Sequence, residues 1–315
     1  MNLSRRRFLE YCGIVAGTIG LTPEDLLGLN EALANPSAPE VIWLHGSSCT
    51  GCSVSFLNYI SDTAPESVVE VLAGSINLTH HATVMTFAGE SCGAVLEHAV
   101  KHGNYILVLE GGVPTAFDGL CCVAYSYKGR EITYAEVVAE MALHASHVVC
   151  AGTCSSFGGI PAAGSNPSGV IRVAEHIAPV GTINISGCPA NPNWVVWAIV
   201  QLLLGNTVAL DSDGRPTALY TQSVGQNSKT TIHQTCPRKS SYQNNRATDI
   251  DDTVGKCLVN LGCRGQWTEA KCNGCWNGTE GNGHWCIGVN SPCIGCVEPE
   301  FPSSQSFFQS YSSGS

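Results

Sequence analysis

The chain has 315 residues, of which 44% are hydrophobic and 13% are charged, so it is long enough for a sizeable core and for two domains. Its net charge of −10 gives no reason to expect nucleic acid or an anionic membrane surface as a partner, and it suits a positively charged protein. The 17 cysteines far exceed ordinary usage, although they are too sparse for a small disulfide scaffold.

The first residues have the pattern of an export signal. The sequence SRRRFL at residues 4–9 is a twin-arginine pattern, a weakly apolar run covers 11–21, and ALA at 32–34 offers small residues at both cleavage positions. We therefore expect residues 1–34 to be a signal peptide and the protein to be periplasmic. An ordinary amphipathic first helix is the alternative interpretation. The twin-arginine route carries folded proteins, typically with their cofactors loaded, so it favours metal over disulfides for the cysteines.

Short apolar segments alternate with helical patterns between residues 40 and 205. The predicted strands are 41–44, 68–72, 105–109, 147–151 and 182–185, and the predicted helices are 53–59, 90–100, 134–143, 170–177 and one that begins near 193. Apolar strands without alternation, separated by helices, indicate a parallel sheet covered on both faces. The longest later apolar run, 194–204, is too short to span a membrane and predicts a core helix.

Three of the predicted strands lead into cysteine loops. The strand at 41–44 precedes Cys49 and Cys52, and the strands at 147–151 and 182–185 precede Cys154 and Cys188. Because ligands bind outside the carboxyl ends of parallel strands, these four thiolates can meet at one point. Zinc remains an alternative to an iron–sulfur cluster at this point, but structural zinc more often uses two close cysteine pairs.

The composition changes at the turn 211–216, which we take as the boundary between a first domain, 35–210, and a second, 211–315. Residues 233–296 hold eight cysteines and His233, with hardly any periodic apolar pattern. Such a segment needs cross-links to become ordered, and disulfides, zinc and iron–sulfur clusters are the candidates. The serine-rich stretch 303–315 carries no anchor, so we expect no stable membrane attachment.

Seven motifs follow one another along the chain. They are Cys49-Thr-Gly-Cys52, Glu110-Gly-Gly-Val-Pro-Thr115, Gly152-Thr-Cys154, Gly187-Cys188-Pro189, His233-x2-Cys236-Pro237, Leu261-Gly262-Cys263 and Pro292-Cys293-x2-Cys296-x-Glu298-Pro299. Their order and intervals resemble the small subunit of periplasmic nickel–iron hydrogenases over essentially the whole mature chain. The resemblance implies an α/β fold, in which a flavodoxin-like parallel-sheet domain precedes a smaller, largely irregular iron–sulfur domain.

The resemblance also implies three clusters and their ligands. The proximal cluster falls on Cys49, Cys52, Cys154 and Cys188, the distal cluster on His233, Cys236, Cys257 and Cys263, and the medial cluster on Cys272, Cys293 and Cys296. In the family these clusters relay electrons between the nickel–iron centre of a separate large subunit and an external carrier. This chain would then form a heterodimer, hold no nickel and carry no catalytic residue of its own.

The medial ligand set departs from the commoner pattern of the family. Most relatives have proline seven residues before the ligand that corresponds to Cys293, and this chain has Cys286 there. That cysteine resembles the nickel–iron–selenium branch, so we expect three [4Fe–4S] clusters. Cys275 is the rival fourth ligand, and the medial cluster is [3Fe–4S] if Cys286 is not a ligand. The single imidazole of His233 removes one negative charge from the distal cluster, which tends to raise its reduction potential.

Two further departures limit the comparison with the family. Ser48 stands where many relatives have an acidic residue, so a proton path through that carboxylate is not expected. Gly51 and Gly159 replace cysteines of the oxygen-tolerant branch, so we expect an ordinary proximal cluster. Five cysteines of the mature chain are left without a role: Cys92, Cys121, Cys122, Cys150 and Cys275.

We therefore expect the electron-transfer subunit of a hydrogenase. Its partners would be the large subunit and a periplasmic multihaem cytochrome c, whose lysines suit the acidity of this chain. Two alternatives remain, namely a stand-alone exported iron–sulfur carrier and a binding protein stabilised by disulfides or zinc. Co-purification with a nickel-containing subunit would exclude a stand-alone carrier, and a colourless preparation would indicate the binding protein.

Overall fold

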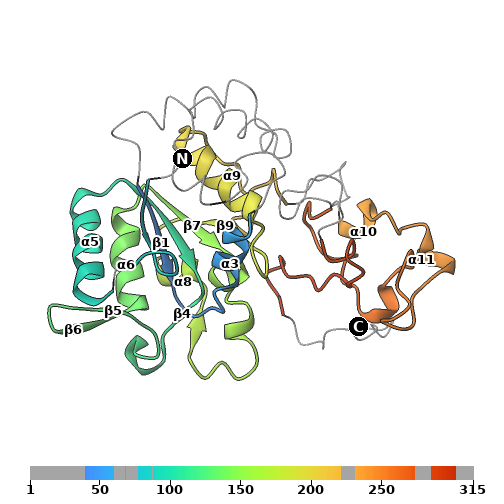
Figure 1. Ribbon diagram of the computed structural model, residues 1–315, viewed down its shortest axis with the longest axis horizontal. Helices are drawn as coiled ribbons and strands as arrows, with labels where there is room; N and C mark the ends of the chain where they lie inside the picture. The colour runs from blue at the N-terminus through green and yellow to red at the C-terminus, as the bar shows by residue number, and fades with distance from the viewer. Residues whose placement is uncertain are drawn as a thin grey trace.

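The computed structural model describes residues 40–59, 68, 77–86, 88–220, 231–273 and 285–302. The expected signal peptide, Cys275 and the stretch 303–315 lie outside the described residues. Figure 1 shows a layered α/β body, which contains the strands and the longer helices, beside a second body with the short helices α10 and α11.

The first body is built on a five-stranded parallel sheet. Its strands are β1 (Glu40–His45), β2 (Leu78–His81), β3 (Tyr105–Glu110), β7 (His147–Ala151) and β9 (Ile183–Ile185), in the order β2-β1-β3-β7-β9. With the strands counted along the chain, this is the order 2-1-3-4-5 of flavodoxin-like sheets, so the predicted fold class is confirmed. Val68, the only described residue of the second predicted strand, 68–72, is helical, and the strand that pairs with β1 on this side is β2, which was not predicted.

Helices cover both faces of the sheet (Figure 1). On one face, α3 (Gly51–Leu57) and α9 (Pro192–Leu203) share a core with Trp43, Ile106 and Val108. On the other face, α5 (Gly89–His102) and α6 (Tyr134–His144) share a core with Ile42 and Leu107. Successive strand residues point to opposite faces, so a sheet buried on both sides has the continuous apolar strands that the sequence displays.

The predicted helix at 170–177 is partly wrong. Residues Val170–Ile171 form β8, which pairs antiparallel with β4 (Val113–Pro114), and only Val173–His176 forms a helix, α8. Asn166 explains the difference, because its side chain accepts a 2.8 Å hydrogen bond from the Val170 N–H and donates one of 2.9 Å to the Val170 carbonyl. These bonds hold Val170 in an extended conformation, so the helix begins only after Arg172, which is the N-cap of α8.

The sequence analysis also missed a hairpin. Strands β5 (Val123–Tyr127) and β6 (Arg130–Thr133) pair antiparallel across Lys128 and Gly129, both of which have positive φ, as the favoured hairpin turn requires. The remaining short elements near the carboxyl edge of the sheet are η1 (Ala116–Gly119), α7 (Thr153–Phe157) and η2 (Ile160–Ala162).

The second body contains little regular structure. Its described helices are α10 (Ile232–Thr235), α11 (Ser241–Asn244) and η3 (Val259–Leu261). Leu258, Trp285 and Val297 of this body join the core that contains Trp194 of α9, which explains why α9 is buried on nearly every side. Along the described ranges, no helix has the length and apolar character to cross a membrane.

Candidate functional site

The first group of thiols lies at the carboxyl edge of the sheet. Cys49 and Cys52 follow β1, Cys154 lies at the start of α7 after β7, and Cys188 follows β9. The electrostatic interactions of Cys154 reach both Cys49 and Cys188, and those of Cys52 reach Cys154 and Cys188. The structure therefore brings together the four cysteines that the sequence placed in the proximal group.

Glycines let the backbone approach these sulfurs. Gly152 has φ +94°, and a Cβ added there would lie 2.4 Å from the Cys52 sulfur. A Cβ on Gly51 would lie 2.9 Å from the Cys49 sulfur. Such contacts are too short for any side chain, so glycine at these positions keeps space around the sulfurs open.

Glu110, at the end of β3, organises the loop that carries Cys49 and Cys52. Its buried carboxylate accepts hydrogen bonds from the Cys52 N–H at 3.0 Å, the Ser53 N–H at 3.1 Å, the Ser53 hydroxyl and the indole N–H of Trp43 at 3.1 Å. The sequence analysis quoted Glu110 only as part of a motif and assigned it no role. An acidic residue that ends an otherwise apolar buried strand was the available signal.

The electrostatics of this group fit a cationic ligand. Burial raises the pKa of Cys154 to about 12, and the neighbouring thiols Cys188 and Cys49 contribute to the increase. The pKa of Cys52 is also raised, first by burial and then by the carboxylate of Glu110. Several buried thiolates repel one another unless positive charge lies between them, and iron bound by cysteine supplies that charge. The donor set therefore fits an iron–sulfur cluster.

The second group of thiols lies in the other body. Cys286 interacts electrostatically with both Cys293 and Cys296, and burial raises the pKa of Cys293 to about 12. Cys272 is buried in the same core as Cys293, and both Cys272 and Cys296 interact electrostatically with Tyr220. The structure thus brings Cys286 to the medial group, whereas its rival Cys275 is outside the described residues.

The third group surrounds a small pocket in the same body. His233, Cys236, Cys257 and Cys263 all line this pocket, together with Gly265 and Ile287. The three thiols interact with one another. The backbone of α10 is held beside this pocket, because the backbone N–H of His233 donates a 2.7 Å hydrogen bond to the Gly265 carbonyl. The pKa of His233 is lowered by burial and then by Lys239, which keeps the ring neutral, as a metal ligand must be.

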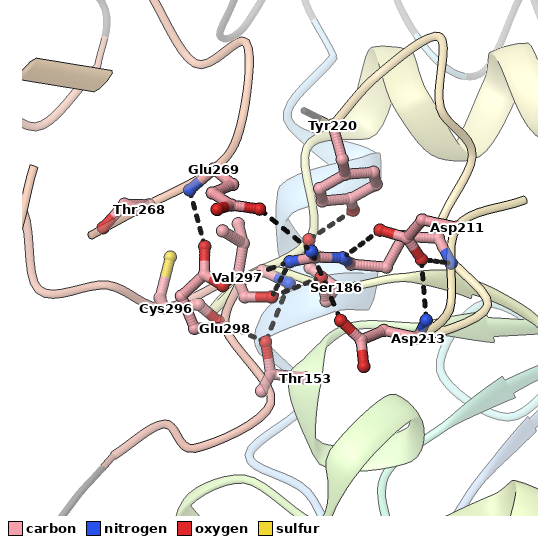
Figure 2. Close-up of polar contacts among 12 residues, drawn as sticks. Thr153, Ser186, Asp211, Asp213, Tyr220, Thr268, Glu269, Cys296, Val297 and Glu298 are labelled. Atoms are coloured by element: carbon pink, nitrogen blue, oxygen red, sulfur yellow. Dashed lines mark hydrogen bonds and ion pairs between the residues drawn. The ribbon is translucent and has the colours of Figure 1, made fainter. Parts of the chain in front are cut away.

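In space the three groups are neighbours in the order proximal, medial, distal. Cys296 of the medial group interacts with Cys188 of the proximal group, and Cys293 interacts with Cys263 of the distal group. Thr153 links the proximal and medial ligand segments. Its hydroxyl donates a hydrogen bond to the Cys296 carbonyl and accepts one of 2.8 Å from the Gly187 N–H (Figure 2). The sequence analysis did not single out Thr153, although it lies within the Gly-Thr-Cys motif.

The remaining described cysteines lie away from these groups. Cys92 contacts His80 through a 3.3 Å bond, Cys150 is fully buried in the sheet, and Cys121 is exposed. Every cysteine in the described ranges is a free thiol. Within the same ranges, no three His, Cys, Asp or Glu side chains converge closely enough to share one metal ion. The ligands of an iron–sulfur cluster each bind a different iron, so they lie further apart than the ligands of a single metal ion.

Two family models match the chain. The model described as "NADH ubiquinone oxidoreductase, 20 Kd subunit" matches residues 49–202, and the model for the C-terminal part of the NiFe/NiFeSe hydrogenase small subunit matches residues 229–309. The periplasmic [NiFeSe] hydrogenase small subunit of Desulfomicrobium baculatum is 37% identical over 98% of this chain and 99% of its own length. The chain belongs to the nickel–iron hydrogenase small-subunit family.

Other members of the family agree with this assignment. The periplasmic [NiFe] hydrogenase small subunit of Solidesulfovibrio fructosivorans is 34% identical over 95% of this chain and 90% of its own length. Among solved structures, the [NiFeSe] hydrogenase of Desulfovibrio vulgaris Hildenborough matches with a TM-score of 0.74 and 34% identity, over 87% of this chain and 98% of that one.

Membership of this family confirms the general role that the sequence predicts. This hydrogenase small subunit has an electron-transfer role, and it takes part in hydrogenase activity within a heterodimer. Small subunits of this family carry iron–sulfur clusters and pair with a large subunit, and the relatives named above are periplasmic. The predicted family, function and type of enzyme are therefore confirmed.

Proposed function

We propose that this small subunit holds three [4Fe–4S] clusters that relay electrons from the large subunit to a periplasmic multihaem cytochrome c. The ligands are assigned in groups of four: Cys49, Cys52, Cys154 and Cys188 for the proximal cluster, Cys272, Cys286, Cys293 and Cys296 for the medial cluster, and His233, Cys236, Cys257 and Cys263 for the distal cluster. Each cluster, when bound, supplies a one-electron carrier.

The observation that carries this proposal is the continuous series of sulfurs. Cys188 interacts with Cys296, and Cys293 interacts with Cys263, so each group has a neighbour within electrostatic range. Isolated structural metal sites have no reason to lie in such a row, whereas a relay requires it. The residues of this chain bind, space and shield the carriers, and they need no acid, base or nucleophile of their own.

Cys286 is proposed as the fourth medial ligand. Its thiol interacts with both Cys293 and Cys296 and is half-buried, and burial raises its pKa. A half-buried thiol within electrostatic range of two other thiols supports this assignment of the fourth ligand. Without it, three cysteines would hold a [3Fe–4S] cluster.

The distal group is the proposed exit for electrons. His233 and Cys236 are only half-buried, whereas Cys272 and Cys293 of the medial group are buried. A neutral imidazole in place of a thiolate removes one negative charge and favours reduction of this cluster. The acidity of the chain attracts a lysine-rich cytochrome c, since opposite charges steer protein association.

Export by the twin-arginine route and the domain boundaries belong to the same proposal. The pattern at residues 4–9 supports folded export of a cluster-loaded subunit, with the mature chain beginning at Asn35. The family models end at residue 202 and resume at 229, on either side of the proposed boundary at 210–211.

Metal analysis of the anaerobically purified heterodimer tests the assignment. Three four-iron clusters give twelve irons in the small subunit, or thirteen per heterodimer with the one iron of the nickel–iron centre, whereas a [3Fe–4S] medial cluster gives eleven, or twelve per heterodimer. A preparation without the visible absorption of iron–sulfur clusters would refute the proposal. Purification of this chain without a nickel-containing subunit would instead favour a stand-alone carrier.

A further inference from the structure

Arg215 is buried among acidic side chains between the two bodies of the molecule. Its side chain is 3% exposed, and its nitrogens lie 2.9 Å from Asp211, 3.3 Å from Glu298, 3.5 Å from Asp213 and 3.9 Å from Glu269. Figure 2 shows the carboxylates of Asp211 and Asp213 on one turn, with those of Glu269 and Glu298 reaching the same centre from two other segments.

The partners of Arg215 connect ligand segments of two proposed clusters. Glu298 follows Cys296 by two residues, and Glu269 precedes Cys272 by three. The Glu269 N–H donates a 2.6 Å hydrogen bond to Glu298, so these two medial segments are joined to each other as well as to Arg215.

The turn that carries Arg215 is tied to the sheet next to the proximal group. The Asn184 N–H of β9 donates a 2.8 Å bond to the Gly214 carbonyl, and the Asn184 side chain donates one of 2.7 Å to the Asp213 carbonyl. Strand β9 leads directly to Cys188. Arg215 therefore joins the strand that positions a proximal ligand to two segments that position medial ligands.

Tyr220 contacts this charge and interacts electrostatically with two medial thiols. The guanidinium carbon of Arg215 is 5.2 Å from the centre of the Tyr220 ring, and the same ring lies within electrostatic range of Cys272 and Cys296. Tyr220 is fully buried, and its hydroxyl donates a 2.7 Å bond to the Ser186 carbonyl. Arg215 and Tyr220 are both buried, so the field of the guanidinium is less screened by solvent than that of a surface charge.

We propose that Arg215 tunes the medial cluster, its buried positive charge raising the reduction potential of the group bound by Cys272, Cys286, Cys293 and Cys296. The inference rests on the ligand assignment proposed above. Arginine remains charged throughout the physiological pH range, so its field is constant. Four carboxylates surround this one cation, and its removal leaves them uncompensated beside a cluster that must accept an electron.

The test is a redox titration of the medial cluster, followed by electron paramagnetic resonance in the anaerobically purified heterodimer. Arg215→Gln removes the charge, and we expect the ratio of reduced to oxidised medial cluster, at the wild-type midpoint potential, to fall about tenfold, or about 59 mV for one electron. Arg215→Lys keeps the charge and should restore the wild-type ratio, even if the lost hydrogen bonds lower stability. A fall as large as that of the glutamine variant would identify a purely structural role and overturn the proposal.

A second variant covers the case in which Arg215→Gln does not assemble. Asp213 is 38% exposed, so Asp213→Asn should fold, and removing this negative charge should raise the same ratio. No change, or a fall, would contradict the proposal. A wild-type protein without any medial signal would refute the ligand assignment instead, so failure of the assignment is distinguishable from failure of the tuning role.

Discussion

The carboxylate of Glu110 accepts a 3.0 Å hydrogen bond from the backbone N–H of Cys52, which links the end of β3 to the loop of the proximal thiols. Glu110 is fully buried, and every hydrogen bond described for its two carboxylate oxygens is one that they accept. This arrangement matches a carboxylate, which accepts and does not donate.

Glu110→Gln should weaken the proximal loop. The introduced amide would place N–H groups against the donors of Ser53 or Trp43, leaving buried groups unpaired at a cost of about 1–3 kcal/mol. We expect a lower urea midpoint for the heterodimer and a loss of proximal iron. Glu131→Gln, at an exposed carboxylate on β6, is the control. Equal stability and iron content in the Glu110→Gln protein would show that the loop does not depend on this residue.

Gly152→Ala should disrupt the proximal group. The added Cβ would lie 2.4 Å from the Cys52 sulfur, and φ +94° is strained for any residue other than glycine. We expect about four irons to be lost per chain. Gly181→Ala is the matched control, because a Cβ there meets nothing within 4 Å. A Gly152→Ala protein with full iron content and an unchanged proximal spectrum would contradict the assignment of Cys52.

Cys286→Ser should convert the medial cluster from four irons to three. Serine is a poor replacement for a thiolate ligand, and Cys293 and Cys296 would remain with Cys272. We expect the loss of one iron per chain and the appearance of a [3Fe–4S] signal in the oxidised protein, measured by metal analysis and electron paramagnetic resonance. Cys121→Ser, at an exposed thiol away from the three groups, is the control. Unchanged clusters in Cys286→Ser would assign the fourth ligand elsewhere.

His233→Cys should slow the exit of electrons. The added thiolate places a negative charge on the distal cluster and lowers its reduction potential, so its reduced form becomes less populated. We expect slower hydrogen-dependent reduction of cytochrome c, while exchange of hydrogen isotopes at the large subunit continues at the wild-type rate. His176→Cys, whose ring contacts the Ala135 carbonyl in the first body, is the control. A raised distal potential would refute the ligand role of His233.

Stability should fall in mild acid because of His81. Burial, followed by the nearby His80 and His45, lowers the pKa of His81 to about 4, and its Nε2 is buried without a hydrogen-bond partner among the described residues. The unfolded chain then binds the extra proton between about pH 6.5 and 4. His81 therefore contributes stability above pH 6.5, and that contribution is lost as the pH falls through this window, by about 3 kcal/mol.

Urea unfolding of the heterodimer from pH 7 to 4.5 measures this effect, and His81→Gln should flatten the slope. His98→Gln, at an exposed ring on α5, should leave it unchanged. An equally steep slope in the His81→Gln protein would assign the acid sensitivity to other groups.

The parallel sheet, the cysteine loops after β1, β7 and β9, and the family could all be predicted from the order of residues alone. Each of these follows from local patterns: continuous apolar strands, helical spacing, and motifs at fixed intervals. The position of β2 could not be predicted, because its sequence, Leu-Thr-His-His, has a single apolar residue, whereas the nearby range 68–72 has four. The exchange of a helix for β8 was also missed, since the side chain of Asn166 competes with the local helical pattern.

The contacts between the motifs depend on how the folded chain packs. Glu110, Thr153 and Arg215 act on segments that are 58, 143 and 83 positions away, at Cys52, Cys296 and Glu298. Such partners are chosen by the packing of the two bodies, and no spacing rule along the chain encodes them. The proximity of Cys286 to Cys293 and Cys296 is likewise a property of packing in a domain with little regular structure. The sequence alone therefore predicts which residues are the ligands, whereas the fold decides which charged side chains lie around them.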